Sequence, residues 1–125
     1  MITQSMHNQN AILGAAMRGT QARNDAILNN IANVDTPGFT ARRVEFESAL
    51  AAAVDRFRDG GRLDLSGTKP SLHFQESGFR FRIDGSNVDM EREMVALYTN
   101  TLRFDVLANS VLHNSRMLGV VFQGR

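Results

Sequence analysis

The chain has 125 residues, of which 42% are apolar, and a formal net charge of +1. It is long enough for one domain with its own core, and its composition fits a globular or helical assembly protein. The charges are spread evenly, and no segment is basic enough to follow a phosphate backbone, which argues against nucleic-acid binding. The sequence contains no cysteine, which excludes disulfides, thiolate metal sites and a cysteine nucleophile.

The N-terminus carries no export or membrane signal of the usual kinds. No Lys, Arg, Asp or Glu precedes Arg18, and the unbroken apolar run of a secretory signal peptide is missing. No stretch of the sequence approaches the roughly 18 to 20 consecutive apolar residues that span a bilayer. We therefore expect no cleaved secretory signal and no membrane-spanning helix.

The first predicted element is a helix from about residue 8 to residue 34, with a ragged start. Spacings of four and three residues give it the a/d seam of a heptad pattern. This N-terminal seam consists of Met6, Asn10, Leu13, Met17, Thr20, Asn24, Ile27, Ile31 and Val34. Its three polar members weaken the seam, and polar residues at such positions more often fix register than add stability.

A turn that no helix can continue through ends this first helix near Asp35. Pro37 removes an amide donor and keeps Thr36 out of the helical region. Gly38 can take the positive φ that a type II turn needs after proline. The sequence therefore predicts a sharp corner at this point.

Three asparagines, Asn29, Asn30 and Asn33, precede the corner although asparagine is a poor helix former. One interpretation is that they lie on the polar face or cap the helix. The other is that they also contact the backbone of a partner. Both interpretations remain open at this stage.

The middle of the chain, residues 36–86, changes character. Phe46, Leu50, Val54 and Phe57 share one helical face before two glycines, which predicts a short amphipathic helix. After it, apolar and charged residues alternate over 79–84, which predicts one short strand or extended segment. The region is too poor in strands to form a separate sheet domain.

The last predicted element is a helix within residues 87–125. Asn87 or Asp89 can cap it, and Asp89, Glu91 and Glu93 place negative charge at the positive end of its dipole. The C-terminal seam consists of Met90, Met94, Leu97, Thr101, Phe104, Ala108, Val111, Ser115, Leu118 and Phe122. Large and small residues are layered in it, so two helices can approach closely and interlock.

A second apolar line runs beside the C-terminal seam and consists of Val95, Tyr98, Leu102 and Val106. A helix that is apolar on two faces usually touches more than one neighbour. Since ordering two long helices costs about as much as burying their seams supplies, we expect them to be marginal in an isolated chain. We expect neighbouring subunits to cover the second line.

The predicted fold is mainly α and elongated. Residues 1–35 and 87–125 form one coiled-coil-like core of two long terminal helices. Residues 36–86 form a short irregular outer segment with one small helix and little β structure.

The sequence contains no recognisable catalytic, cofactor-binding or metal-binding constellation. His7, His73 and His113 are isolated, and none has a partner at metal-ligand spacing. Glu91 and Glu93 are two residues apart and point to different faces of a helix, so they do not form a catalytic pair. We predict no catalytic residue, no cofactor and no metal.

The stretch from Ala32 to Phe39 resembles a signature of a known family. Ala32, Asn33, Thr36, Pro37, Gly38 and Phe39 match the pattern A-N-x-x-T-P-G followed by Phe or Tyr. This signature follows the N-terminal helix in the axial proteins of the bacterial flagellum, which are the rod, hook and hook-junction subunits. The layout of heptad helices at both ends is also similar to that family.

Two further stretches resemble one of the proximal-rod types of this family. Its C-terminal helix opens with a run similar to the one formed here by Asp84, Gly85, Val88, Asp89, Glu93 and Met94. The stretch 41–50 is similar to its segment after the turn. The short middle segment excludes distal rod and hook types, which carry larger outer domains.

The resemblance implies a non-enzymatic structural subunit of the proximal rod, in the periplasmic part of the basal body. Such a subunit polymerises through its terminal helices into the drive shaft that transmits torque and encloses the export channel. It is exported through the flagellar type III channel without a cleaved signal. The implied partners are copies of itself, other proximal-rod proteins, the rod adapter protein, the membrane and supramembrane ring and the export gate, with no nucleic acid and no small-molecule substrate.

Two sets of residues are expected to serve this assembly. The assembly motif is Asn29, Asn30, Ala32, Asn33, Thr36, Pro37, Gly38 and Phe39. The core of the two seams is Leu13, Met17, Ile27, Ile31, Val34, Met90, Met94, Leu97, Phe104, Val111, Leu118 and Phe122. The alternative functions are a soluble helical adaptor that binds one partner helix through the same seam and, more remotely, an enzyme with a dispersed site.

Overall fold

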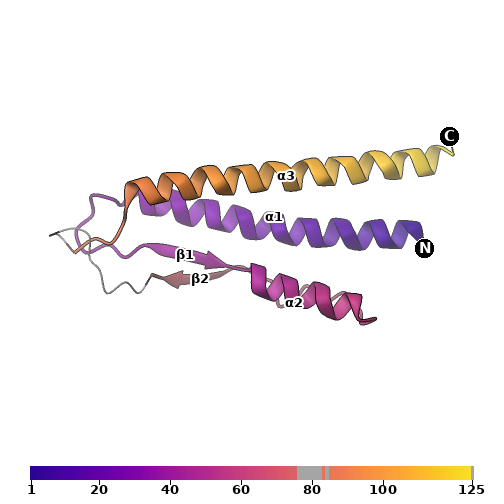
Figure 1. The fold of residues 1–125 in the computed structure, drawn as a ribbon, viewed down its shortest axis with the longest axis horizontal. Helices are drawn as coiled ribbons and strands as arrows, with labels where there is room; N and C mark the ends of the chain where they lie inside the picture. The colour runs from indigo at the N-terminus through magenta and orange to yellow at the C-terminus, as the bar shows by residue number, and fades with distance from the viewer. Residues whose placement is uncertain (76–82, 84, 125) are drawn as a thin grey trace.

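Two long antiparallel helices dominate the computed structural model, which describes residues 1–75, 83 and 85–124. Helix α1 (Ile2–Ala32) and helix α3 (Met90–Gln123) lie side by side, and both chain termini are at the same end of the pair (Figure 1). Helix α1 also contacts strand β1 (Arg42–Glu45) and helix α2 (Glu47–Arg58). It therefore occupies the middle of the molecule. The predicted mainly α fold with long terminal helices is confirmed.

Helix α1 begins at Ile2, so the predicted start near residue 8 is wrong. No glycine or proline interrupts the first thirteen residues, and Gln4 donates a hydrogen bond to Asn8 one turn later at 3.2 Å. Side-chain pairs four residues apart support a helix of this kind. The helix ends at Ala32, ahead of the predicted turn.

The middle segment contains a two-stranded antiparallel sheet that the sequence did not predict. Strand β1 pairs with strand β2 (Ser71–Phe74), and Arg42 lies opposite Phe74. The amphipathic helix predicted here is confirmed as α2, which ends at Arg58. Gly60, just beyond its end, has a φ of 91°. The extended segment predicted over 79–84 lies, apart from Ile83, outside the described residues.

The apolar core lies between α1, β1 and α2. Ala26, Val44 and Phe46 are buried there, with Ala22 and Leu50 packed against them. The face of α1 that meets this core is made of small residues. A Cβ atom added at Gly19 would lie 2.3 Å from Cγ of Phe46, so only glycine fits beneath the ring. Helix α1 thus has a second packing face besides its seam.

Polar side chains join α1 to α3 along their length. Asn100 donates to the carbonyl oxygen of Thr20 at 2.9 Å, and Asn114 donates to Oδ1 of Asn10 at 3.2 Å. Asn10 and Thr20 belong to the N-terminal seam, whereas Asn100 and Asn114 are next to seam positions on α3 rather than in the seam. The residues of α3 that face α1 are therefore shifted around the helix, by part of a turn, from the apolar C-terminal seam that the sequence predicted.

The seam residues differ widely in burial. Ile27 is buried, and Leu13, Met17, Ile31, Val34, Met94, Leu97, Phe104, Val111 and Leu118 are half-buried. Met90 and Phe122 are exposed, Phe122 at 76%. Within the described part of α1 and α3, all fully buried residues lie between Ala15 and Asn30 or at Glu93 and Asn100. The packed half of the helix pair is the half next to the corner, away from the chain termini.

The fit of Gly19 under Phe46 predicts opposite effects for two glycine substitutions in α1. Gly19→Ala should lower the free energy of unfolding by about 1 to 3 kcal/mol, because its methyl group overpacks the core. Gly14→Ala meets only the end of Arg18 at 3.6 Å and should raise stability by up to about 1 kcal/mol through helix propensity. Urea unfolding followed by circular dichroism measures both. Equal effects in the two variants would contradict the packing of Phe46 on α1.

Candidate assembly site at the end of helix α1

The turn after α1 has the conformation that Pro37 and Gly38 predict. Gly38 has a φ of 71°, and the amide of Phe39 donates to the carbonyl oxygen of Thr36 at 3.2 Å. Both features are those of a type II turn with proline at its second position. Ala32, Thr36, Pro37 and Gly38 are exposed and Phe39 is half-buried, so the turn projects from the molecule.

Asn33 closes its own helix. Its side-chain amide donates to the carbonyl oxygen of Asn29 at 2.8 Å, and its Oδ1 accepts from the hydroxyl of Thr36 at 3.2 Å. These bonds satisfy a terminal carbonyl that the helix leaves without a partner. Oδ1 of Asn29 is buried and has no hydrogen-bond partner among the described residues. The capping interpretation therefore holds for Asn33, and Asn29 keeps an acceptor unused within the chain.

Asn30 has a different task, because its side chain joins three segments. It is fully buried, and its amide donates to the carbonyl oxygen of Arg42 at 2.9 Å while Oδ1 accepts from the Arg42 amide at 2.8 Å. The same amide donates to Oε2 of Glu93 on α3 at 3.1 Å. Asn30 thus makes with the backbone of Arg42 the pair of hydrogen bonds that a neighbouring strand would make, and it also binds α3. Its partner backbone belongs to its own chain.

Glu93 is a fully buried carboxylate in the interface between the two long helices. The guanidinium of Arg43 lies 2.6 Å from its Oε1, and Asn30 binds its other oxygen. A buried charge is tolerated when it is paired and hydrogen-bonded. Sequence reasoning placed Glu93 in the first helical turn and in the run that resembles a proximal-rod type, but not in a buried ion pair, because its partners lie far away in the chain.

Asn87 holds the other side of the segment after the turn. Its Oδ1 accepts from the amide of Ala41 at 2.7 Å, and its side-chain amide donates to the carbonyl oxygen of Gln75 at 3.1 Å. We call Asn30, Asn87 and the backbone of Ala41 and Arg42 the asparagine clamp. The clamp fixes where the chain leaves α1 and where it enters α3.

The capping alternatives for α3 are resolved in favour of Asp89. Oδ1 of Asp89 accepts from the amides of Glu91 at 3.1 Å and Arg92 at 3.3 Å. A carboxylate at this position satisfies free amides and complements the helix dipole. Asn87, the other candidate cap, is engaged in the clamp instead.

Arg23 joins α1 to the start of α2 beside the clamp. It forms an ion pair with Glu47, donates to the carbonyl oxygen of Val44 at 3.0 Å and lies 5.0 Å from the centre of the Phe46 ring. Burial raises the pKa of Glu47, but the hydrogen bond and charge of Arg23 outweigh it and hold that pKa below its usual value. Glu47 therefore stabilises the fold above the pKa of the unfolded chain and loses this effect as the pH falls through the folded pKa.

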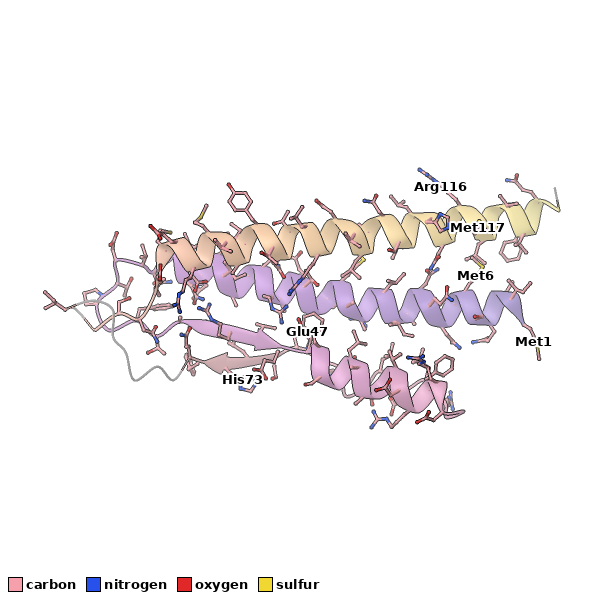
Figure 2. The ribbon with its side chains drawn as sticks, viewed as in Figure 1. Met1, Met6, Glu47, His73, Arg116 and Met117 are labelled. Atoms are coloured by element: carbon pink, nitrogen blue, oxygen red, sulfur yellow. The ribbon has the colours of Figure 1, made fainter. Side chains whose placement is uncertain are left out.

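Metal binding and membrane crossing find no support among the described residues. Among them, no three or more His, Asp or Glu side chains gather in a way that could hold a metal ion. None of their helices is long and apolar enough to cross a membrane. His73 on β2 lies 2.6 Å from the hydroxyl of Ser71 and points away from the helices (Figure 2).

Comparison with known proteins places this arrangement in a class. Residues 12–40, which include the end of α1 and the whole turn, match the family model of the flagella basal body rod protein. The flagellar basal body rod protein FlgB of Proteus mirabilis is 33% identical over 119 residues, which cover 82% of this chain and 85% of the relative. FlgB of Borrelia hermsii is 30% identical over 115 residues, which cover 81% and 85%. FlgB of Bacillus subtilis is 29% identical over 114 residues, which cover 87% and 88%.

The fold and these matches define a structural protein of the flagellar basal body rod. The match runs along most of the chain rather than over the signature alone. The chain belongs to the FlgB family of flagellar basal body rod proteins.

The asparagine clamp predicts unequal roles for neighbouring asparagines. Asn30→Ala should lower the free energy of unfolding by about 3 kcal/mol or more, because it leaves buried groups of Arg42 and Glu93 unpaired. Asn33→Ala removes one cap at a half-exposed position and should cost about 1 kcal/mol. Urea unfolding of the two variants gives the comparison. A loss at Asn33 as large as that at Asn30 would contradict the clamp.

The ion pair of Arg23 predicts a pKa change at one carboxylate only. In Arg23→Met the pKa of Glu47 should rise, since the hydrogen bond and charge of Arg23 no longer oppose its partial burial. The pKa of Asp64, which hydrogen bonds from Ser66 lower, serves as the internal control and should not move. NMR titration of both carboxylates measures this. An unchanged Glu47 titration in the variant would show that Arg23 does not set its pKa.

Proposed function

We propose that this rod protein is a structural subunit of the proximal rod. Its terminal helices polymerise into the drive shaft that transmits torque and encloses the export channel. Residues 1–35 and 87–125 form the core of that shaft, and residues 36–86 form an outer segment directed toward the surrounding ring. The role is non-enzymatic, in keeping with the names of its relatives.

The observation that carries this proposal is the apolar line of α3. Val95, Tyr98, Leu102 and Val106 are 65% to 67% exposed. At about 100° per residue, this line lies on the face of α3 opposite Glu93 and Asn100, which contact α1. Four large apolar residues in a row on an outer face mark a surface that another protein covers. The line extends the interface of α3 beyond its own chain.

The uneven packing of the long helices supports folding that is completed on assembly. Full burial of residues in α1 and α3 is confined, among the described residues, to the half next to the corner. The other half exposes Leu112, Met117, Val120 and Val121. Segments with few buried contacts are the first to open. Neighbouring subunits would supply the missing contacts at these ends.

The expected partners follow from this location in the rod. They are further copies of the chain, the other proximal-rod proteins, the rod adapter protein, the membrane and supramembrane ring and the export gate. A chain with weakly packed helix ends is suited to pass unfolded through the type III export channel. Export takes place without cleavage of a signal peptide.

The exposed turn supplies the test of this function. The double change Pro37→Ala with Gly38→Ala lets α1 continue where the chain must leave it, because alanine restores the amide and disfavours the positive φ of Gly38. A strain with only this variant should lose most swimming motility and most rods in isolated basal bodies. The controls are Thr20→Ala and Thr101→Ala, which should impair assembly less.

Motility and rod counts equal to those of the controls would contradict a role of the corner in assembly. A protein absent from basal bodies altogether, yet forming a discrete soluble oligomer in sedimentation, would favour the helical adaptor instead.

A further inference from the structure

A groove lies between α3 and the segment formed by β1 and α2, with α1 as its floor. It consists of two adjoining cavities of about 380 and 580 Å³ that share Arg23, Glu47, Thr99 and Arg103. We call it the arginine groove. The cavity nearer the corner is lined by more arginines and the one nearer the chain termini by more apolar side chains, so the groove has a polar end and an apolar end.

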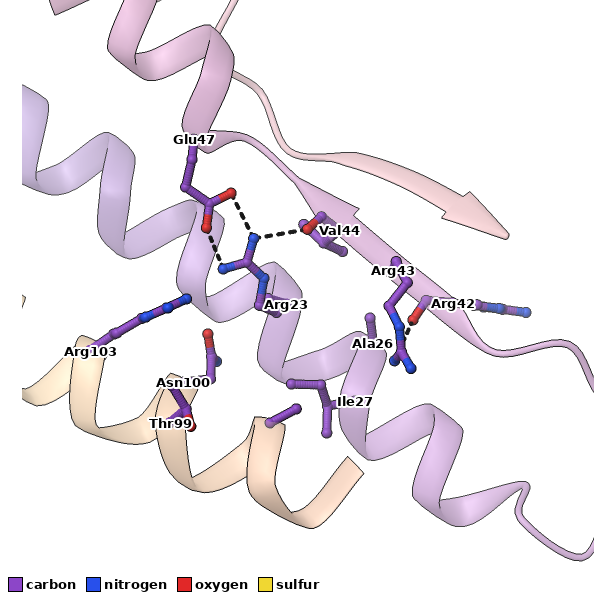
Figure 3. Close-up of a pocket in the computed structure, with 11 residues that line it drawn as sticks. Arg23, Ala26, Ile27, Arg42, Arg43, Val44, Glu47, Thr99, Asn100 and Arg103 are labelled. Carbon is purple, nitrogen blue, oxygen red and sulfur yellow. Dashed lines mark hydrogen bonds and ion pairs between the residues drawn. The ribbon is translucent and has the colours of Figure 1, made fainter. Parts of the chain in front are cut away.

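The groove carries a cation that its own chain leaves unpaired. Arg23 is paired with Glu47, and Arg43 is paired with Glu93. Arg103, which lines both cavities, has no hydrogen bond or ion pair within the described chain. Its side chain reaches from α3 toward α1 (Figure 3). An arginine in the middle of a groove is suited to bind a carboxylate in two hydrogen bonds.

The buried side chain of Asn100 adds an unused acceptor at the polar end. It is 2% exposed, and its amide group already donates to the carbonyl oxygen of Thr20. Its Oδ1 points into the groove and has no hydrogen-bond partner among the described residues (Figure 3). Because buried polar atoms are normally paired, this oxygen calls for a donor on whatever fills the groove.

The other end of the groove is apolar and continues onto the outside of α3. Its walls are Leu102 and Val106 on α3 and Phe46 and Leu50 at the start of α2, over Ala16 of α1. Leu102 and Val106 also belong to the exposed apolar line of α3. The groove and that part of the line are therefore one continuous surface, and a partner that fills the groove covers both.

The acceptor, the cation and the apolar wall lie one helical turn apart along α3. Asn100, Arg103 and Val106 follow one another at steps of three residues, about 4.5 Å of helix each. A second helix laid along α3 presents the residues of one face at steps of about 5 Å. Two turns of it can place a donor at Asn100, a carboxylate at Arg103 and an aliphatic side chain at Val106. This row lies wholly within the groove.

We propose that the arginine groove binds a helix of a different protein of the basal body, which carries a donor, an acid and a large aliphatic residue at successive turns of one face. This inference rests on the proposed rod function and specifies the chemistry of one neighbour. The acid pairs with Arg103, and the aliphatic residue packs against Leu102 and Val106. The charge pair fixes the register of the helix, and the apolar end supplies the burial.

A second copy of the chain does not supply this row. In a shaft whose two ends differ, all copies point the same way, so each helix of a second copy has one direction in the groove. In that direction α1 would bring Gln21, one turn before Asp25, to the apolar end. Asp105 on α3 is followed by small and polar residues, and Asp55 on α2 by charged ones. Glu91 is followed by the apolar line, which is itself part of the groove wall.

Charge reversal at Arg103 tests the contact. A strain with only Arg103→Glu should form fewer rods in isolated basal bodies, by about tenfold or more, because like charges then meet. Arg103 is exposed and has no partner within the described chain, so the purified variant should keep the urea unfolding curve of the unchanged protein. Arg116→Glu, on an exposed part of α3 outside the groove, is the matched control and should leave the number of rods unchanged.

Cross-linking in cells identifies the occupant. A photoreactive diazirine residue in place of Thr99, which lines both cavities and is exposed, should link to another basal-body protein. Mass spectrometry of the linked peptide should show a helix with an acid one turn from a large aliphatic residue. Exchange of that acid for lysine should restore rods in the Arg103→Glu strain. The same photoreactive residue in place of Arg116 should not link to that helix.

The outcomes separate this contact from the function. Links to a second copy of the chain, to a segment without an acid, or to no protein in basal bodies that contain rods would each overturn the proposal. Rod numbers for Arg103→Glu equal to those for Arg116→Glu would do the same. In all these cases rods that contain the chain leave the proposed function intact. Failure of the unchanged chain to enter basal bodies would refute the function itself.

Discussion

The buried side chain of Asn30 is the contact on which the arrangement of the chain depends. It binds the backbone of Arg42 with both its donor and its acceptor, and it binds Glu93 on α3. These bonds are directional, so another register of α3 against α1 would leave a buried carboxylate without its partner. Apolar contacts tolerate small shifts along a helix, whereas an unpaired buried charge does not. Polar contacts therefore fix how the two long helices and the strand meet.

The corner and the helix ends differ in how they are held. Near the corner, Asn30, Asn87 and the core around Phe46 tie four segments together. Toward the termini, a hydrogen bond between the side chains of Asn10 and Asn114 links the two described helices, and large apolar residues such as Val120 are exposed. The chain has one firmly packed end and one end whose apolar surface is available. This division fits the proposed subunit, whose corner is packed within its own chain and whose exposed apolar helix ends are buried by neighbouring subunits.

Local rules predicted the elements that local chemistry determines. The turn at Pro37 and Gly38, the helix before Gly60 and the capping by Asp89 each depend on a few adjacent residues. The clamp and the bond from Asn30 to Glu93 could not be predicted, because Asn87 and Ala41, and likewise Asn30 and Glu93, are far apart in the chain. The predicted seam was chosen by apolar character and so left out Asn100. The cost of burying Asn100 is offset by its hydrogen bond to the carbonyl oxygen of Thr20, which forms only when the two helices pack together. The four-residue strands were too short to show a period.

Helix α3 reverses the usual arrangement of an amphipathic helix. Part of the face that it turns to its own chain carries Glu93 and Asn100, while the opposite face carries Val95 and Tyr98. Within the chain, the contacts of Glu93 and Asn100 give α3 its position but bring little burial of apolar surface. The hydrophobic free energy of the outer face becomes available only when another molecule covers it. In the proposed assembly the two tasks are therefore separated: polar pairs within each subunit set the geometry, and apolar contacts between subunits supply the stability.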